Sequence, residues 1–277
     1  MSVALDDIKY FVVVSETTNI TRASEILGIT QPTLSYAIKR LERDLGGELL
    51  IRLKSGIRLT KMGEEFLKRS RKLIFEWEQA QNITNPDSGL AQSRYTFAIH
   101  PSVALYSLGE FLPDILKQFP QIECQFLHGL SREMTEKVIS WEADFGIVVN
   151  PVQHPDLVIK KLCTDTVSLF YKKGCDERLI YDPSLAQSQF ILKKLKKMTT
   201  QMNGEICSGN LEVIANLAAS GQGYGLLPSR VARQYKSLKQ KEGAPIFKDD
   251  ICLVYRPEKH RNPTSQAIIN YIREGSI

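Results

Sequence analysis

Residues 21–42 read Thr-Arg-Ala-Ser-Glu-Ile-Leu-Gly-Ile-Thr-Gln-Pro-Thr-Leu-Ser-Tyr-Ala-Ile-Lys-Arg-Leu-Glu and predict two short helices that meet at a tight turn. Gly28 stands where a helix end needs a residue that tolerates positive φ. Thr30 suits the cap of the next helix, whose first turn accepts Pro32 because its missing N–H would be unpaired there anyway. This helix-turn-helix geometry lays its second helix into a DNA major groove.

The second predicted helix has an apolar face and an opposite polar face. The apolar face carries Leu34, Ile38, Leu41 and Leu45. The polar face and the exposed N-terminal end carry amide, hydroxyl and cationic groups, which read base edges and bind phosphates. We expect DNA contacts from Thr21, Arg22, Gln31, Pro32, Thr33, Ser35, Tyr36 and Lys39. The alternative for this stretch alone is a helical hairpin with an ordinary solvated face.

A basic hairpin is predicted directly after this motif. Two short β-type runs flank Lys54-Ser55-Gly56, which suits a hairpin tip. The cations Arg52, Lys54 and Arg58 make this hairpin a wing beside the second helix, where they can bind phosphates. Residues 1–72 hold 13 Lys/Arg against 9 Asp/Glu, so most of the chain's net charge of +5 lies in its first quarter. That excess is modest, and the placement of the cations matters more than their sum.

A long helix is predicted from Thr60 to about Thr84, where Asn-Pro-Asp-Ser-Gly at 85–89 breaks it. A seam of the coiled-coil kind, with 4-3-4-3 spacing, is formed by Phe66, Ser70, Leu73, Trp77 and Ala80. We therefore expect this helix to pair two chains. The alternative is that it packs only on its own winged domain.

The N-terminal part of the chain resembles the LysR-type transcriptional regulators. The matching segments are the predicted first helix at 8–14, the motif at 21–41, Leu-Leu-Ile-Arg at 49–52 and Leu-Thr-Lys-Met-Gly-Glu at 59–64. One departure is Tyr36, where the family more often has Arg; a phenol can hydrogen-bond a base or a phosphate but adds no charge.

The resemblance implies a winged helix-turn-helix domain at 1–62 and a linker helix with a hinge at 63–89. In the family this helix pairs two chains and presents two reading heads to double-stranded DNA. The expected assembly is a homotetramer built from two such dimers, and the transcription machinery is a further expected partner.

Residues 90–277 are long enough for one or two compact subdomains, and strand and helix patterns alternate along them. Strands are predicted at 95–99, 122–127 and 144–149, and helices at 105–119 and 133–141. This order predicts an α/β fold with a parallel sheet, whose second unit begins at 167–171. The alternate glycines at 221–225 follow a helix and precede a strand, the reverse of a dinucleotide-binding loop, so they predict a tight turn.

The LysR resemblance extends more weakly over residues 94–273, through Trp-Glu-Ala-Asp-Phe-Gly-Ile at 141–147 and the segment 221–228. It implies an effector-binding domain at 90–277, made of two Rossmann-like lobes of the type 2 periplasmic-binding-protein kind and joined by two crossovers. We place lobe one at 90–162 plus 259–277 and lobe two at 163–258. Asn150-Pro151 is expected to mark the first crossover, and the helix of lobe two before Ser208 to be trimmed or rebuilt.

Ligands of open α/β sheets bind at the carboxyl ends of strands, where this chain has two suitable loops. The predicted effector-binding residues are His100, Pro101, Ser102, Val103, His128, Ser131, Asn150 and Gly209. Ser102 opens a helix whose free N–H groups favour an anion such as a carboxylate or phosphate; the alternative is a plain N-cap. In the family the matching position usually contacts the effector. His100 and His128 could tune affinity with pH or be structural loop histidines.

Enzyme chemistry finds little support in the sequence. No Ser or Cys stands in a nucleophile elbow, and neither the four histidines nor the five cysteines have metal-ligand spacing, so we expect no cofactor or metal. Odd, widely spaced cysteines without an export signal indicate reduced thiols in a cytoplasm. Since no apolar run approaches about 18 residues, we expect no membrane span. The alternative function is a small-molecule-binding protein, or a relic enzyme of the same lobe fold, with an N-terminal oligomerisation module.

Overall fold

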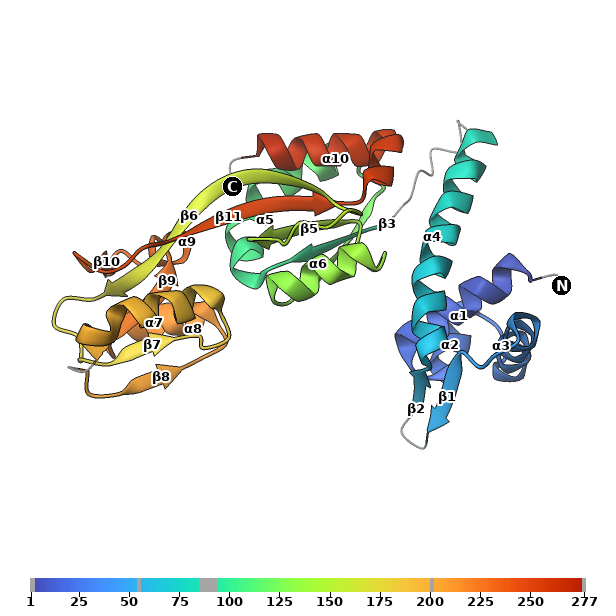
Figure 1. The fold of residues 1–277 in the computed structure, drawn as a ribbon. Helices are drawn as coiled ribbons and strands as arrows, with labels where there is room; N and C mark the ends of the chain where they lie inside the picture. Colours follow the sequence, from blue (N-terminus) through green and yellow to red (C-terminus); the bar gives the residue numbers. More distant parts are fainter. Residues whose placement is uncertain (1–2, 54–55, 85–93, 200–201, 276–277) are drawn as a thin grey trace. The chain divides into compact units, whose positions relative to one another are not determined.

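The computed structural model describes residues 3–53, 56–84, 94–199 and 202–275, which fall into two compact units. The first unit comprises residues up to 93 together with Ser140–Glu142, and it holds the N-terminal helices, a hairpin and one long helix (Figure 1). The second begins at Arg94 and holds an α/β fold of two lobes. None of the described helices is both long enough and apolar enough to cross a membrane.

The N-terminal unit is a winged helix-turn-helix, as predicted. Its elements are α1 (Leu5–Thr17), α2 (Ile20–Leu27), α3 (Gln31–Leu45), β1 (Leu50–Leu53), β2 (Gly56–Leu59) and α4 (Lys61–Thr84). Gly28 ends α2 at φ +64°, and the Thr30 side chain caps α3 by accepting the Thr33 N–H. Pro32 lies in the first turn of α3. The turn therefore forms from the local signals that predicted it.

One apolar core holds this unit together. It contains the fully buried Phe11, Val14, Ala23, Leu34, Leu41 and Leu49, and Leu67 of α4 packs into it. Burial of these side chains stabilises the packing of α3 against the rest of the unit, since each deleted methylene group would cost about 1 kcal/mol. Arg40 of α3 also donates two hydrogen bonds, of 2.6 and 2.8 Å, to the buried Asp7 of α1. The opposite face of α3 is exposed.

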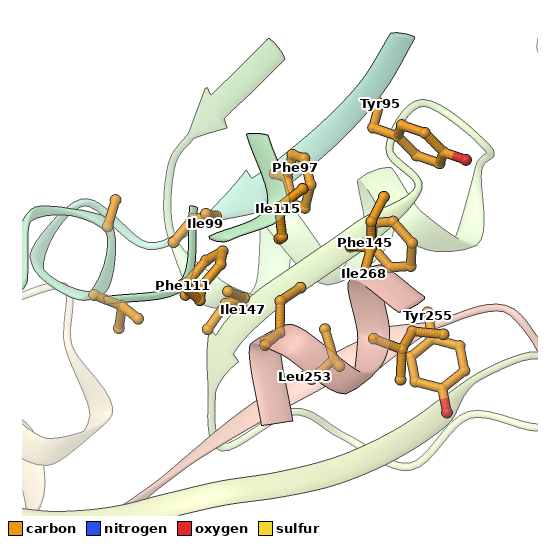
Figure 2. Packing of buried hydrophobic residues seen from close by; sticks show 14 of the residues in the cluster. Tyr95, Phe97, Ile99, Phe111, Ile115, Phe145, Ile147, Leu253, Tyr255 and Ile268 are labelled. Carbon is orange, nitrogen blue, oxygen red and sulfur yellow. The ribbon is translucent and has the colours of Figure 1, made fainter. Parts of the chain in front are cut away.

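Lobe one of the second unit is a parallel β-α-β arrangement closed by the C-terminal helix. Its elements are β3 (Arg94–Ile99), α5 (Pro101–Gln118), β4 (Glu123–His128), α6 (Ser131–Ile139), β5 (Phe145–Val149), a 3-10 turn (Pro257–Arg261) and α10 (Pro263–Glu274). Phe97, Phe145 and Ile147 of the sheet face Ile268 of α10 across a closely packed core (Figure 2). The C-terminal segment therefore belongs to lobe one.

Lobe two has the same kind of order. Its elements are β7 (Leu179–Tyr181), α7 (Ala186–Thr199), β8 (Glu205–Cys207), α8 (Leu211–Ala219), β9 (Tyr224–Pro228), α9 (Ser229–Ala232) and β10 (Lys239–Gln240). Strands β8, β7 and β9 are parallel to one another. The helix before Ser208 is not trimmed, because α7 spans 14 residues. Lys193 and Lys194 are exposed on that helix and form part of a solvated face.

The sheet is mixed, which corrects the prediction of a parallel sheet. Two long strands, β6 (Val158–Tyr171) and β11 (Phe247–Tyr255), pair antiparallel with each other and run through both lobes (Figure 1). The first crossover is β6 itself, so Asn150-Pro151 only opens the loop that leads to it. Residues 251–255 of β11 pair with β5, so they lie in lobe one and the predicted end of lobe two at 258 is too late.

Candidate functional site

The polar face of α3 is exposed as predicted. Gln31, Pro32, Thr33 and Lys39 are exposed, the Tyr36 side chain is 63% exposed, and Ser35 is half-buried. Thr21 and Arg22 are exposed at the start of α2. The structure thus exposes amide, hydroxyl, phenol and ammonium groups along the same helix, α3. Such a mixture can accept and donate hydrogen bonds to base edges and bind phosphates.

The wing beside this surface presents two exposed cations on different faces. Arg52 lies opposite Ile57 in the antiparallel ladder, whereas Arg58 lies opposite Ile51. Because neighbouring residues of a strand point to opposite faces, Arg52 and Arg58 project from opposite sides of the hairpin. The sequence did not reveal this separation. The predicted contact Lys54 lies outside the described residues.

Helix α4 divides the predicted pairing seam into two parts. The Phe66 ring packs on Phe11 of its own domain at a centroid distance of 5.4 Å, and Ser70 is buried. Farther along the helix, the Leu73 and Trp77 side chains are each 47% exposed, and Ala80 is exposed. Only the second part of the seam is therefore open to another chain.

Two adjoining cavities of about 710 Å³ each lie between the lobes of the second unit. Of the predicted effector residues, His100 lines both, Pro101, Ser102, His128 and Gly209 line the first, and Ser131 and Asn150 line the second. Val103 lines neither cavity, because it points into the core of lobe one and is 1% exposed. The size suits a small organic ligand.

Ser102 is not the cap of α5, because His100 holds the N-cap position; Ser102 instead connects the two lobes. Its hydroxyl lies 3.0 Å from His100 Nδ1 and accepts a hydrogen bond of 3.2 Å from Arg230 Nη2 of lobe two. Arg230 Nη1 also lies 2.7 Å from Asp165 on the crossover strand β6. Arg230 Nε is buried and has no hydrogen-bond partner among the described residues. A ligand acceptor could satisfy that donor.

A second link between the lobes centres on Asp249 of β11. Its carboxylate accepts hydrogen bonds from Asn150 Nδ2 of lobe one at 2.8 Å and from Gln187 Nε2 of lobe two at 3.0 Å. Burial raises the pKa of Asp249, and the two amide donors oppose that rise. Asn150 holds this position at φ +50°, with its backbone N–H bonded to Asp250. Strand β11 thus carries a carboxylate that is hydrogen-bonded to both lobes.

His100 cannot tune affinity near neutral pH. Burial, and secondarily the charge of Arg230, lowers the pKa of this imidazole to about 4. The ring therefore stays neutral across the physiological range.

His100 should instead make stability fall as the solution is acidified. The unfolded chain takes up the imidazole proton near pH 6.5, and the folded chain takes it up only near pH 4. Between these values the folded state loses up to roughly 3 kcal/mol relative to the unfolded state. Between pH 7 and 5, the melting temperature of the His100→Asn variant should fall less than that of the parent. Equal losses in scanning calorimetry would contradict this assignment.

Charged residues around the cavities that were not predicted from the sequence include Asp165, Asp182, Arg230 and Asp249. Asp182 directly follows β7, and Arg230 lies two residues beyond the carboxyl end of β9, so the strand-end rule applied to lobe two would have found both. Asp165 and Asp249 lie inside the crossover strands. Nothing in their local sequence distinguishes them from other strand residues.

Both units of the chain match known protein families. Residues 5–64 match the bacterial regulatory helix-turn-helix proteins of the lysR family, and residues 88–276 match the LysR substrate binding domain. The chain is 23% identical to the HTH-type transcriptional regulator YofA of Bacillus velezensis over 96% of each chain.

Solved structures show the same fold. A single-residue variant of full-length OxyR from Pseudomonas aeruginosa aligns over 100% of this chain and 96% of its own, with a TM-score of 0.76 and 22% identity. The LysR family regulator CbnR in complex with its target DNA aligns over 99% of this chain and 100% of its own, with a TM-score of 0.59 and 19% identity. The chain therefore belongs to the LysR family of DNA-binding transcriptional regulators, which are not enzymes.

Proposed function

We propose that this regulator binds a two-fold symmetric operator as a dimer and changes its DNA affinity when a small effector binds between its lobes. The observation that carries the proposal is the link from Ser102 in lobe one to Arg230 in lobe two, beside a cavity large enough for a ligand. A ligand that binds one lobe arrangement better than the other shifts the balance between them. Such a regulator would act in the cytoplasm, where its DNA lies.

We infer that α3 contacts the bases and that the wing binds phosphates. Gln31 and Ser35 stand near the start of α3, the end of a recognition helix that contacts base edges. Arg52 and Arg58 are exposed, and guanidinium groups suit phosphates. In a dimer paired through Leu73, Trp77 and Ala80 of α4, the two winged helix-turn-helix domains would bind two half-sites. Two such dimers would form the tetramer.

Two substitutions should separate the two kinds of DNA contact. Ser35→Ala should weaken operator binding about fivefold, or roughly 1 kcal/mol, and leave binding to scrambled DNA nearly unchanged. Arg58→Ala should weaken binding to both duplexes alike and reduce the dependence of log K on log salt by about one unit. Fluorescence anisotropy across a salt series measures both quantities. Arg52→Ala is the matched comparison, because Arg52 lies on the opposite face of the wing. The variant with the larger change in salt slope identifies the face that contacts DNA.

If Ser35→Ala weakens binding to the operator and to scrambled DNA equally, Ser35 does not make a sequence-specific base contact. An unchanged salt slope in both wing variants would remove the wing from the phosphate contacts. Either result leaves the effector site to be judged on its own measurements.

We also propose that the effector presents an anionic group to Ser102 and Arg230. The unpaired Nε donor of Arg230 and the N-terminus of α5 support this orientation, because both favour a carboxylate or phosphate oxygen. The second cavity adds Ser131, whose hydroxyl accepts the Val149 N–H at 2.9 Å. A ligand at this place touches loops of both lobes.

A further inference from the structure

The first cavity has an acidic wall formed by Glu133 of lobe one and by Asp182 and Glu212 of lobe two. The described residues that line it include no lysine or arginine. We propose that this wall binds the ammonium group of a free α-amino acid, whose carboxylate reaches Arg230. This inference rests on the proposed effector site and specifies the chemical class of its ligand.

Asp182 is the strongest reason for a cationic ligand. It is only 3% exposed, and its Oδ1 accepts hydrogen bonds from the Ser184 N–H at 2.8 Å and the Ser184 hydroxyl at 2.6 Å. Its Oδ2 accepts no hydrogen bond from the described residues, and none of them forms an ion pair with it. The Asp182 carboxylate lines the first cavity, where a ligand ammonium would supply the cation that the described residues do not.

Arg230 can hydrogen-bond a ligand carboxylate, but its ion pair with Asp165 leaves it no net positive charge to offer. Asp165 already balances its charge at 2.7 Å, so its unpaired Nε lacks a hydrogen-bond acceptor rather than a counter-charge. A simple carboxylate would bring its charge toward Asp182, Glu133 and Glu212 with nothing to offset it. A zwitterion satisfies Arg230 and Asp182 together.

Asp182 lines the first cavity, and Arg230 lines the second and donates a hydrogen bond to Ser102 of the first. Arg230 and Asp182 both act on the His100 ring, the first lowering its pKa and the second raising it. The two cavities share His100, Leu130 and Leu211. A small ligand at this junction can place one end at Asp182 and the other at Arg230 and Ser102. Leu105 and Leu108 line the first cavity and can contact the side chain of the amino acid.

The test begins with the unmodified full-length protein and the twenty standard amino acids in a thermal-shift assay. The amino acid with the largest shift is then compared, by titration calorimetry, with its deaminated carboxylate and its decarboxylated amine. We expect the amino acid to bind at least 30-fold more tightly than either analogue. Because this comparison changes only the ligand, it does not depend on the folding of a variant.

Asp182→Asn gives the complementary test. The amide keeps an oxygen for the Ser184 hydrogen bonds and removes only the charge. We expect at least 30-fold weaker binding of the amino acid. Glu136→Gln removes one carboxylate from the lining of the second cavity and is the matched control, with an expected change below threefold.

The proposal is overturned if the deaminated carboxylate binds as tightly as the amino acid, or if Asp182→Asn binds with unchanged affinity. It is also overturned if no amino acid raises the melting temperature while the same protein binds its operator specifically. In that case the regulatory assignment stands and only the ligand class fails. Loss of specific DNA binding by the parent would instead contradict the proposed function.

Discussion

Replacing Arg230 by methionine should lower the melting temperature of the effector domain by about 6–12 °C. The side chains of Arg230 and Asp165 are 15% and 11% exposed, so the substitution leaves the Asp165 carboxylate largely buried without its cation. Breaking such a pair costs about 3 kcal/mol, and each kcal/mol shifts the melting temperature of a domain of this size by roughly 2–4 °C. Scanning calorimetry of the full-length protein measures the shift.

A second substitution distinguishes charge from packing. In the Arg230→Met background, Asp165→Asn removes the orphaned charge but keeps an oxygen for the Thr166 N–H, which Asp165 accepts at 2.7 Å. We expect at least half of the lost stability to return. Arg178→Met, which removes an exposed pair with Asp176 at 3.9 Å, should cost less than 1 kcal/mol. A double variant as unstable as Arg230→Met would show that packing, not the buried charge, explains the loss.

Replacing Trp77 by glutamate should abolish the dimer and weaken operator binding by roughly 100-fold or more. A carboxylate in an apolar seam between chains is buried without a partner, and separated heads lose the benefit of binding two half-sites together. Analytical ultracentrifugation reports the assembly, and anisotropy on the operator reports the affinity.

The control for this experiment is Lys68→Glu, an exposed position on the same helix that lies outside the seam. It introduces the same carboxylate but should leave the dimer intact. A Trp77→Glu protein that stays fully dimeric would place the pairing surface elsewhere.

The helix-turn-helix could be predicted from its sequence because its signals are local. Gly28, Thr30 and Pro32 each fix the backbone of their own turn, and the apolar positions of α3 repeat within one helix. Strand β6 shows the opposite case. Only its end, from Val167, is buried, whereas its first half is partly exposed and carries Lys160 and Lys161, so the pattern showed a short strand. Its pairing with β11, about 80 residues later, is a long-range contact that local patterns do not encode.

The cleft could be predicted only in part. The strand-end rule identified the loops of His100 and Ser102, which do line a cavity. It failed at Val103, because the residue after Ser102 points toward the sheet. It also could not show that Ser102 contacts Arg230, 128 residues away in sequence, since that contact exists only once the lobes are placed against each other.

The most direct test of the account is the operator preference of the full-length protein. Duplexes selected from a random pool by the immobilised protein are compared with a scrambled duplex of the same composition, at one fixed salt concentration, by fluorescence anisotropy. We predict a two-fold symmetric consensus that is bound at least about 1,000-fold more tightly than the scrambled duplex. Equal affinity for the selected and scrambled duplexes would contradict sequence-specific reading by α3.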